Sequence, residues 1–287
     1  MDNPSFVTHS ETFLQDGVVL LPNVLDEAAM ARVERAYDWS AAQHSPALQD
    51  FSSSDDEEFI ADTGSSIREP VYQTLLSDTV IGDIAHGLFG GESPVWYLGE
   101  QIFLKQGPEG TRRTPWHQDT PYGNFMGPKL LAVWIPLDEI PRSGSLEVVR
   151  GSHRSTLYNG SRFEPGDDTA PLYPESDLPR LPEIESERDQ WDIVGCTLTP
   201  GDVIAFHIGC LHGGGGTAPG VQRRSLVLRF VGDDVVWVER NEVAHPDSSV
   251  ARRARAAAAA GRPPRIATPP PLGEPVWRSH RFTQVRP

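Results

Sequence analysis

The stretch Pro200-Gly-Asp-Val-Ile-Ala-Phe-His207 contains a turn followed by a short apolar strand. Proline and glycine favour the turn, and the residues from Val203 to His207 have the β-branched and aromatic character of a buried strand. Directly afterwards, Cys210-Leu-His212 leads into four consecutive glycines, Gly213 to Gly216. Short apolar runs between glycine and proline turns are typical of β-rich proteins.

Further short strands are expected on both sides of this stretch. They cover residues 95–98, 101–105, 130–137, 145–149, 191–198, 225–231 and 235–239. Within 145–149, Leu146 and Val148 alternate with Glu147, which is the period-two pattern of a half-buried strand. Roughly eight short strands separated by turns predict a mostly β protein with flanking helices, built on a cupin-like jelly roll, also called a double-stranded β-helix.

Helices are expected before this β-rich part. Asp26 is a candidate N-cap, and Met30, Val33 and Tyr37 recur on one helical face, while residues 70–90 also have helical character. The polar residues 43–66 are expected to be a mobile loop, and a polar, proline-rich insertion fills about 155–190. We therefore expect a single domain over 1–287. Its parts are a helical N-terminal part (1–90), a jelly-roll core (about 95–240) and a C-terminal cover (241–287).

Composition narrows the possible partners. The formal net charge of −15 would repel the phosphates of a nucleic acid, so no nucleic-acid partner is expected. No stretch approaches the ~20 apolar residues of a membrane span, and the N-terminus lacks the basic start and apolar run of a signal peptide. Two cysteines are too few for a disulfide framework. A cytoplasmic protein with a small-molecule substrate is expected, and its oligomeric state stays open.

The densest chemical signal is Thr114-Pro-Trp-His-Gln-Asp-Thr-Pro-Tyr122. In an extended segment, residues i and i+2 point to the same side, so His117 and Asp119 can present an imidazole and a carboxylate to one point. On its own, this His-x-Asp pattern fits a surface salt bridge at least as well.

Two further signals lie downstream. The glycines after His212 leave the backbone open to a close ligand, although a histidine beside a flexible turn can also be incidental. Arg223 opens an apolar run, where an inward guanidinium would be costly unless it met a carboxylate. The neighbouring Arg224 is expected to be solvated.

Together these signals favour a metal centre. Two histidines and one carboxylate on a β-scaffold form the facial triad of non-haem iron enzymes, which leaves three coordination positions open. A keto acid can chelate at two of these positions and dioxygen can take the third. Arg223 would then hold the far carboxylate of the keto acid.

At this point the chain resembles the phytanoyl-CoA dioxygenase family of Fe(II)/2-oxoglutarate-dependent oxygenases. The resemblance covers most of the chain and rests on an ordered set of short motifs. They are Phe13-Leu-Gln-Asp-Gly-Val-Val-Leu-Leu-Pro22, Trp116-His-Gln-Asp119, Gly144-Ser-Leu-Glu-Val-Val-Arg-Gly-Ser-His153, Gly201-Asp-Val-Ile-Ala-Phe206, His212-Gly and Arg223.

The resemblance implies a role for each matching residue. The iron ligands, and thus the catalytic residues, would be His117, Asp119 and His212. His207 is an alternative to His212, but it is not followed by the glycine run and does not have the eleven-residue spacing to Arg223 that His212 has. The 2-oxoglutarate contacts would be Arg223, Gln101, Trp134 and Ser225. The presence of Asp119 also favours hydroxylation over halogenation, because relatives that halogenate lack this carboxylate. The expected substrate-pocket residues, which lie in or near the His-Gln-Asp motif, are Trp116, Tyr122 and Phe125.

The resemblance therefore implies hydroxylation of a small molecule with Fe(II), 2-oxoglutarate and O2, releasing succinate and CO2. An Ala/Arg/Gly/Pro-rich sequence suggests a GC-rich bacterial gene and a natural-product intermediate as substrate. Two alternatives remain open. One is a zinc-dependent hydrolase or isomerase on the same barrel, which gives Arg223 no evident role. The other is a catalytically silent binding module, which would not need three intact ligands.

Overall fold

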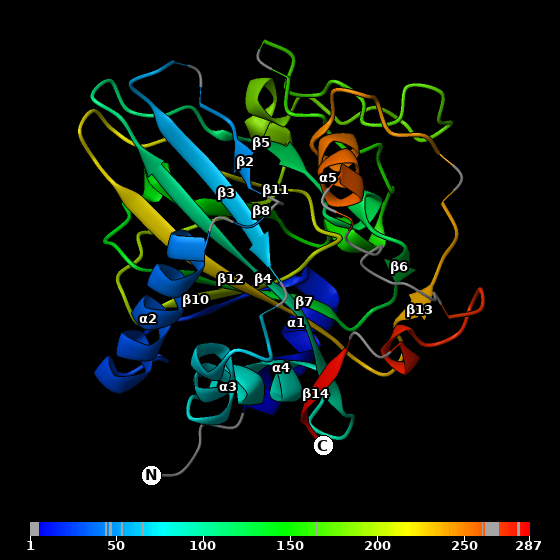
Figure 1. Ribbon diagram of the computed structural model, residues 1–287. Coiled ribbons are helices and arrows are strands. Elements are labelled where there is room, and N and C mark those ends of the chain that lie inside the picture. The colour runs from blue at the N-terminus through cyan, green and yellow to red at the C-terminus, as the bar shows by residue number, and fades with distance from the viewer. Residues whose placement is uncertain are drawn as a thin grey trace.

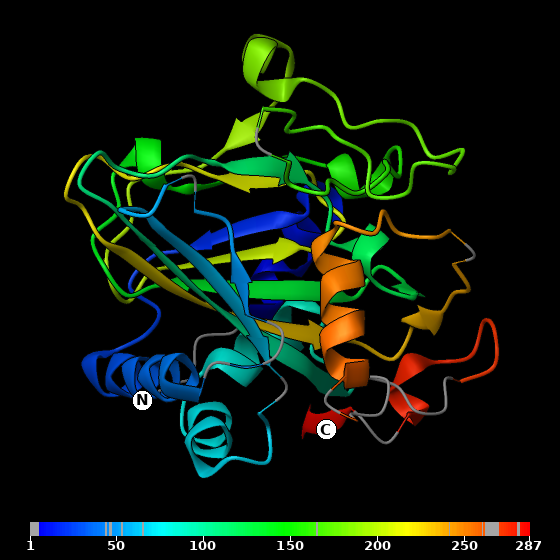
Figure 2. The ribbon, with the colours of Figure 1, turned by 45° about the horizontal axis from the view of Figure 1, so that its top comes forward.

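The computed structural model shows two facing β-sheets with helices packed on the outside of the larger sheet (Figures 1 and 2). The described residues are 6–43, 45, 48–52, 54–64, 66–164, 166–240, 242–259, 261, 270–279 and 282–287. The mostly β jelly roll with flanking helices that the sequence predicts is confirmed.

The large sheet is antiparallel throughout and has the strand order β1-β10-β7-β12-β4-β3-β2, with β14 also paired to β4. Its strands are β1 (Val18–Leu21), β2 (Gln49–Asp50), β3 (Glu58–Gly64), β4 (Val95–Gln106), β7 (Leu130–Pro136), β10 (Val203–His207), β12 (Arg223–Val231) and β14 (Thr283–Arg286). The longest strands, β4 and β12, pair along most of their length and form the centre of the sheet.

The small sheet has the order β5-β11-β8-β9 and faces the large one. Its strands are β5 (Thr114–His117), β8 (Leu146–Val149), β9 (Ile193–Val194) and β11 (His212–Gly214). A separate ribbon pairs β6 (Phe125–Met126) with β13 (Val236–Trp237). The space between the two sheets holds one apolar core, which includes Trp134, Leu146, Phe206 and Val227.

A second core lies between the large sheet and the four α-helices that precede β4. The α-helices are α1 (Ser10–Asp16), α2 (Glu27–Gln43), α3 (Pro70–Ser77), α4 (Ile81–Leu88) and α5 (Ser249–Ala259). The 3₁₀ segments are η1 (Phe6–His9), η2 (Thr120–Tyr122), η3 (Arg142–Gly144), η4 (Ser152–Arg154), η5 (Ile184–Ser186), η6 (Arg188–Gln190) and η7 (Val276–Arg278). The predicted helical stripe of Met30, Val33 and Tyr37 is buried in this core, against sheet residues such as Leu226 and Leu228.

The prediction of a mobile loop at 43–66 is wrong, because β2 and β3 lie within this segment. Phe59 and Ala61 are buried on β3, which pairs with β4 along its whole length. The acidic run before β3 masked this short apolar alternation in the sequence. Strands β1, β2, β3 and β14 come from outside residues 95–240 and yet belong to the large sheet. The division of the chain into an N-terminal part, a core and a C-terminal cover stays a proposal.

The two strands expected at 95–98 and 101–105 form one strand, β4. At Gly99 its backbone has φ +155, where the register with β12 shifts, and a Cβ atom there would meet the carbonyl oxygen of Gly64 at 2.7 Å. A glycine at this bulge lets β3 stay close to β4.

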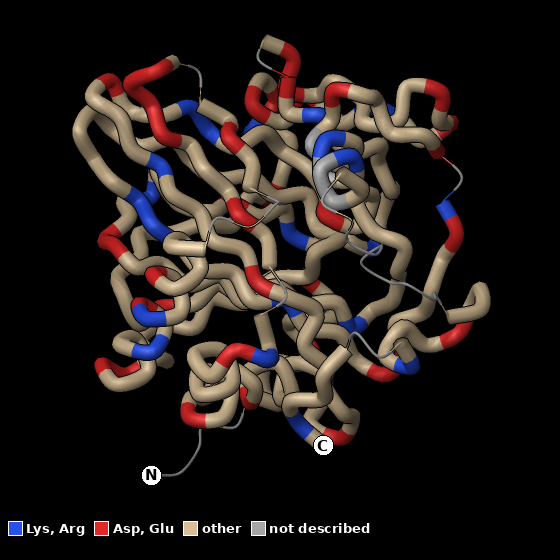
Figure 3. Tube along the Cα trace, viewed as in Figure 1, with Lys and Arg blue, Asp and Glu red and all other residues tan. Residues whose placement is uncertain are grey.

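Acidic residues are spread over the loops in the view of Figure 3, and basic residues are scattered or gathered on α5. Among the described residues, no helix combines the length and the apolar character that a membrane crossing needs. The insertion after residue 155 lies over the outer face of the small sheet, where Leu181 and Ile184 pack on Trp116 and Val149.

Candidate metal centre and cosubstrate pocket

The small sheet brings the three predicted iron ligands together. His117 ends β5 and His212 begins β11, and the antiparallel register of these strands pairs the two residues directly. One side-chain ligand atom of each of His117, Asp119 and His212 lies within 4.8 Å of the others. The Oδ1 atom of Asp119 is 3.5 Å from Nε2 of His117 and 3.8 Å from Nε2 of His212. This cluster of two imidazoles and one carboxylate matches the ligand set of a facial iron site.

Backbone carbonyls fix both imidazole rings. Nδ1 of His117 lies 2.8 Å from the carbonyl oxygen of Pro115, and Nδ1 of His212 lies 2.9 Å from that of Cys210. Because a carbonyl only accepts, Nδ1 donates in both cases and Nε2 keeps its lone pair toward the cluster. Burial, followed by the nearby His117, lowers the pKa of His212 to about 3. Its imidazole is therefore neutral at pH 7, the form that binds a metal.

The carboxylate of Asp119 is also held from behind. Its backbone N–H donates to the carbonyl of Ile208 at 2.8 Å, and its Oδ2 accepts from Nε and Nη2 of Arg229 at 3.2 and 2.9 Å. Arg229 donates a further bond, of 2.8 Å, to Gln101. Burial raises the pKa of Asp119, but Arg229 and the two histidines outweigh it and lower the pKa below its ordinary value. Oδ1 is thus left facing the histidines as a charged ligand atom.

Arg229, which pairs with the candidate ligand Asp119, was not singled out in the sequence analysis. It lies six residues after Arg223 on β12, and alternate residues of a strand share a face. That spacing was the available signal, but its pairing with Asp119 depends on the arrangement of the two sheets.

Replacing Arg229 with methionine is expected to weaken metal binding by about 10–100-fold, because the charged partner that orients Asp119 is lost. Isothermal titration with Co(II) would measure this effect. Arg224→Met is the matched control, since Arg224 lies on the same strand and pairs with Asp138 at 2.7 Å, away from the cluster. Equal Co(II) affinity in Arg229→Met and wild type would contradict this role.

Beside the cluster, Arg223 is buried on β12 and is 5% exposed. Its Nη1 donates to the carbonyls of Gly144 and Gly215, whereas its Nε has no hydrogen-bond partner among the described residues. Burial, followed by the charge of Arg113, lowers the pKa of Arg223 to about 10, which still leaves the guanidinium charged at pH 7. A buried cation with a free donor is suited to an incoming carboxylate.

The hydroxyl of Ser225 is a second free polar group. Ser225 is fully buried two residues after Arg223, and its Oγ also lacks a partner within the described chain. On β12 the residues Arg223, Ser225, Val227 and Arg229 share one face by alternation, and all but Ser225 line the pocket beside the cluster. The Nε of Arg223 and the Oγ of Ser225, both without a partner among the described residues, fit the far carboxylate of 2-oxoglutarate.

The pocket beside the cluster contains about 1430 Å³ of empty space, part of it open to solvent. Among the residues predicted for cosubstrate and substrate, Gln101, Trp134, Tyr122, Phe125 and Arg223 line it. Further lining residues, which the sequence analysis did not single out, are Phe51, Phe59, Phe103, Arg112, Phe163 and Phe206.

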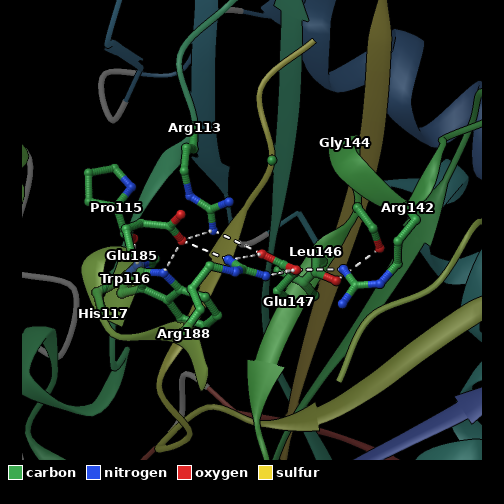
Figure 4. Close-up of polar contacts among 12 residues, drawn as sticks. Arg113, Pro115, Trp116, His117, Arg142, Gly144, Leu146, Glu147, Glu185 and Arg188 are labelled. Carbon is green, nitrogen blue, oxygen red and sulfur yellow. Dashed lines mark hydrogen bonds and ion pairs between the residues drawn. The ribbon is translucent and has the colours of Figure 1, made fainter. Parts of the chain in front are cut away.

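Trp116 does not line this pocket and is corrected as a substrate residue. It precedes His117 on β5, so it points to the opposite face of the small sheet. There it is 5% exposed, packs with Leu181 and Ile184, and donates from Nε1 to Glu185 at 2.6 Å (Figure 4).

The glycine run after His212 has two different roles. Gly213 and Gly214 line the pocket, as their expected role in ligand approach requires. At Gly215 and Gly216, a Cβ atom would meet the carbonyl oxygens of Ser143 and Thr111 at 2.0 and 2.1 Å. These two glycines therefore serve close backbone packing.

His207, the alternative ligand considered from the sequence, lies elsewhere. Its Nδ1 accepts from the backbone N–H of Gly209 at 3.0 Å, so Nε2 donates to the carbonyl of Gly127 at 3.1 Å. Both ring nitrogens are thereby occupied, and the ring contacts His153 and Phe13.

A cluster of charged residues fastens the insertion to the outer face of the small sheet (Figure 4). Glu147 on β8 pairs with Arg113 at 3.1 Å, with Arg188 at 2.7 Å and with Arg142. Glu185 pairs with Arg113 at 3.0 Å and Arg188 at 2.9 Å. Burial raises the pKa of Glu147, but the three arginines outweigh it and lower the pKa from its ordinary 4.5 to about 2. The strand that carries His117 is thus supported from behind.

Replacing Glu147 with glutamine is expected to lower Tm at pH 7 by about 5–10 °C, because three guanidinium groups lose their shared carboxylate. Since the folded-state pKa lies below the ordinary one, the stabilisation is present above pH 4.5 and is lost as pH falls toward about 2. The Tm difference should therefore narrow below pH 4.5 in thermal melts. Glu164→Gln, whose carboxylate pairs with Arg162 and is more exposed than that of Glu147, is the control. A constant or absent difference would refute the prediction.

Comparison with known proteins agrees with this site. The family model of phytanoyl-CoA dioxygenase (PhyH) matches residues 13–225. No curated protein sequence matches significantly. Among solved structures, the non-heme alpha ketoglutarate dependent epimerase SnoN from nogalamycin biosynthesis has 18% identity and a TM-score of 0.67, with 100% of both chains covered.

Two other similar structures have lower TM-scores. The carbocyclase SnoK, also from nogalamycin biosynthesis, has 16% identity and a TM-score of 0.64 over 96% of this chain and 95% of its own. EctD from S. alaskensis, solved with 2-oxoglutarate and 5-hydroxyectoine, has 22% identity and a TM-score of 0.59 over 85% and 82%. At such identities these likenesses show the shared fold.

The family model covers most of the chain and spans His117, Asp119, His212 and Arg223. The cofactors implied by the sequence, Fe(II) and 2-oxoglutarate, are confirmed by the family together with the His-Asp-His cluster. The chain belongs to the phytanoyl-CoA dioxygenase family.

Proposed function

We propose that this protein hydroxylates a small organic molecule in an Fe(II)/2-oxoglutarate-dependent reaction. The observation that carries the proposal is the position of two features in one pocket. The His-Asp-His cluster and the buried Arg223, whose Nε has no partner among the described residues, line the same pocket.

In this proposal His117, Asp119 and His212 hold the iron, and Arg223 with Ser225 holds the far carboxylate of 2-oxoglutarate. Gln101 and Trp134 are assigned to the wall beside the cosubstrate. When bound, iron and 2-oxoglutarate supply the activation of dioxygen, in which 2-oxoglutarate becomes succinate and CO2 and a substrate C–H bond is oxidised.

The residues around the centre set its charge and orientation. The two imidazoles face the site through Nε2, because their Nδ1 atoms donate to backbone carbonyls. Arg229 holds Asp119 in one rotamer through two hydrogen bonds. The ligand set therefore has one negative charge and a fixed geometry before any metal binds, which reduces the reorganisation that binding requires.

The pocket walls supply the remaining requirements. Leu98, Trp134, Phe206 and Ile208 form an apolar lining beside the cluster, which excludes water from the reacting carbon. The guanidinium of Arg223 is buried in the lining of the pocket, so a keto acid anchored there leaves the more exposed part of the pocket to the substrate.

Among the reactions of Fe(II)/2-oxoglutarate enzymes, we propose hydroxylation because Asp119 occupies the position of the carboxylate ligand. Structural neighbours include an epimerase and a carbocyclase, so other oxidations are possible on this fold. A zinc hydrolase would leave the free Nε of Arg223 without a role, and a silent module would not need the hydrogen-bonded orientation of all three ligands. A role in natural-product biosynthesis is part of this proposal.

The test is a substrate screen that records both succinate release and the product mass. Hydroxylation predicts succinate release that requires Fe(II) and 2-oxoglutarate, with a product heavier by one oxygen atom. A product of unchanged mass would indicate epimerisation instead of hydroxylation. A product lighter by two hydrogen atoms would indicate desaturation or ring closure. Iron-loaded protein that forms no succinate, even the small amount formed without substrate, would refute the oxygenase assignment.

A further inference from the structure

We propose that the substrate contains a flat aromatic or conjugated ring system, which stacks on an aromatic wall formed by Phe51, Tyr122 and Phe163, with the buried Phe59 packed against Phe51. This inference rests on the proposed function, because it assigns the wall to the substrate of the same metal centre. All four residues line the pocket beside the His-Asp-His cluster.

The four rings form a connected row that reaches the metal centre. The ring of Phe163 lies 5.1 Å from that of the ligand His117 and is stacked on Tyr122, at 6.1 Å and an interplanar angle of 18°. On its other side it lies 5.4 Å from Phe51, which in turn lies 5.2 Å from Phe59. Phe51 is tilted by 60° to Phe163, so the nearly parallel rings of Tyr122 and Phe163 offer the flat face. A planar substrate stacked on either of these two rings would lie beside His117.

Three separate parts of the chain build this wall. Phe51 and Phe59 come from the β2–β3 region, Tyr122 from η2, and Phe163 from the insertion over the small sheet. Phe51, Tyr122 and Phe163 are each only half-buried, so part of each ring remains exposed. Aromatic rings that are brought together but left partly exposed provide a surface for another ring.

The backbone of Phe163 indicates that its ring is retained for function. Its φ of +57 lies in the left-handed region, which is unfavourable for a bulky residue and natural for glycine. Its ring is nevertheless only half-buried. Strain of this kind is concentrated at binding and catalytic sites.

Hydrogen bonds hold the strained turn in place. The N–H of Phe163 donates to Oγ of Ser161 at 2.9 Å, and that hydroxyl donates to the carbonyl of Asp168 at 2.9 Å. The Tyr122 hydroxyl donates to the carbonyl of Ser161 at 2.6 Å. Tyr122 and Phe163 are therefore fixed relative to each other, as a preorganised stacking surface requires.

The charges along the pocket argue against an acyl-CoA substrate. Arg229 is paired with Asp119, and Arg223 lies on the cosubstrate side. The remaining lining guanidinium in the described part of the chain is Arg112, whose centre lies 6.0 Å from the Phe59 ring. One cation does not match the several phosphates of an acyl-CoA, but it suits one polar or anionic substituent on a ring.

The experiment uses flavone, a flat and uncharged probe that does not chelate iron, and measures binding by calorimetry to protein loaded with Co(II) and 2-oxoglutarate. Flavone is expected to bind at least about tenfold more tightly than adamantan-1-ol, which is apolar but not flat, and than octanoyl-CoA. Phe163→Leu keeps the apolar bulk without the ring and should weaken flavone binding about tenfold, whereas Phe163→Tyr should retain it.

Phe163→Gly separates binding from folding. Glycine relieves the left-handed strain, so this variant should keep or raise Tm while losing flavone affinity. The proposal is overturned if flavone binds no better than adamantan-1-ol, or if Phe163→Leu binds flavone like wild type. Succinate formation is measured in parallel. If the protein binds flavone but its Fe(II)-loaded form makes no succinate, even the small amount formed without substrate, the proposed function is refuted and the aromatic wall is not. If the Fe(II)-loaded form makes succinate but flavone does not bind, only the aromatic wall is refuted.

Discussion

Asp119→Ala is expected to abolish succinate formation and to weaken Fe(II) binding by more than about a hundredfold. The variant removes the one charged ligand of the cluster, whose Oδ1 lies 3.5 and 3.8 Å from the two imidazole nitrogens. It also leaves the guanidinium of Arg229 without its carboxylate partner, and this cost adds to the loss. Metal titration and a succinate assay would measure both effects.

Asp138→Ala is the matched control for this experiment. Asp138 also pairs with an arginine of β12, Arg224, but on the opposite face of the strand. It should retain metal affinity and activity while losing a similar ion pair. A fully active Asp119→Ala variant would disprove the ligand assignment.

Arg223→Ala is expected to raise the apparent KM for 2-oxoglutarate by about a hundredfold, with metal affinity largely retained. The reason is the loss of a buried charge-assisted contact, which is worth about 2–5 kcal/mol. Arg223→Lys should recover only part of the affinity, because an ammonium group lacks the planar donor arrangement of the guanidinium. Steady-state succinate formation at varied 2-oxoglutarate concentration would measure both variants.

Arg223 also donates to the carbonyls of Gly144 and Gly215, so thermal melts must accompany the kinetics. Succinate rates at saturating 2-oxoglutarate should recover toward wild type if binding alone is impaired. An unchanged KM in a folded Arg223→Ala variant would remove Arg223 from the cosubstrate site.

The sequence predicted those parts of the site that depend on local spacing. His117 and Asp119 are two residues apart, and His212 precedes a glycine run, so each is recognisable within a few residues. The chain brings them together because β5 and β11 pair in a register that sets His117 opposite His212. Strand alternation alone also predicts that Trp116 faces away from His117, and this was overlooked in assigning it to the pocket.

Other parts depend on contacts between distant segments. Arg229 and Asp119 are 110 residues apart, and their pairing follows from the packing of the large sheet against the small one. Phe51 and Phe163 meet through the β2–β3 region and the insertion, neither of which has a regular apolar pattern that would reveal it. The strand β3 was missed because Phe59 and Ala61 follow a strongly acidic run that resembles a loop.

The most direct test of the Fe(II)/2-oxoglutarate site is an anaerobic visible spectrum of the purified protein with Fe(II) and 2-oxoglutarate. We expect a weak metal-to-ligand charge-transfer band that requires both components and is weakened in Arg223→Ala at the same 2-oxoglutarate concentration. Iron binding without this band would contradict the assigned cosubstrate site and favour a metal-dependent hydrolase or isomerase. A protein that binds no iron would instead be a silent binding module.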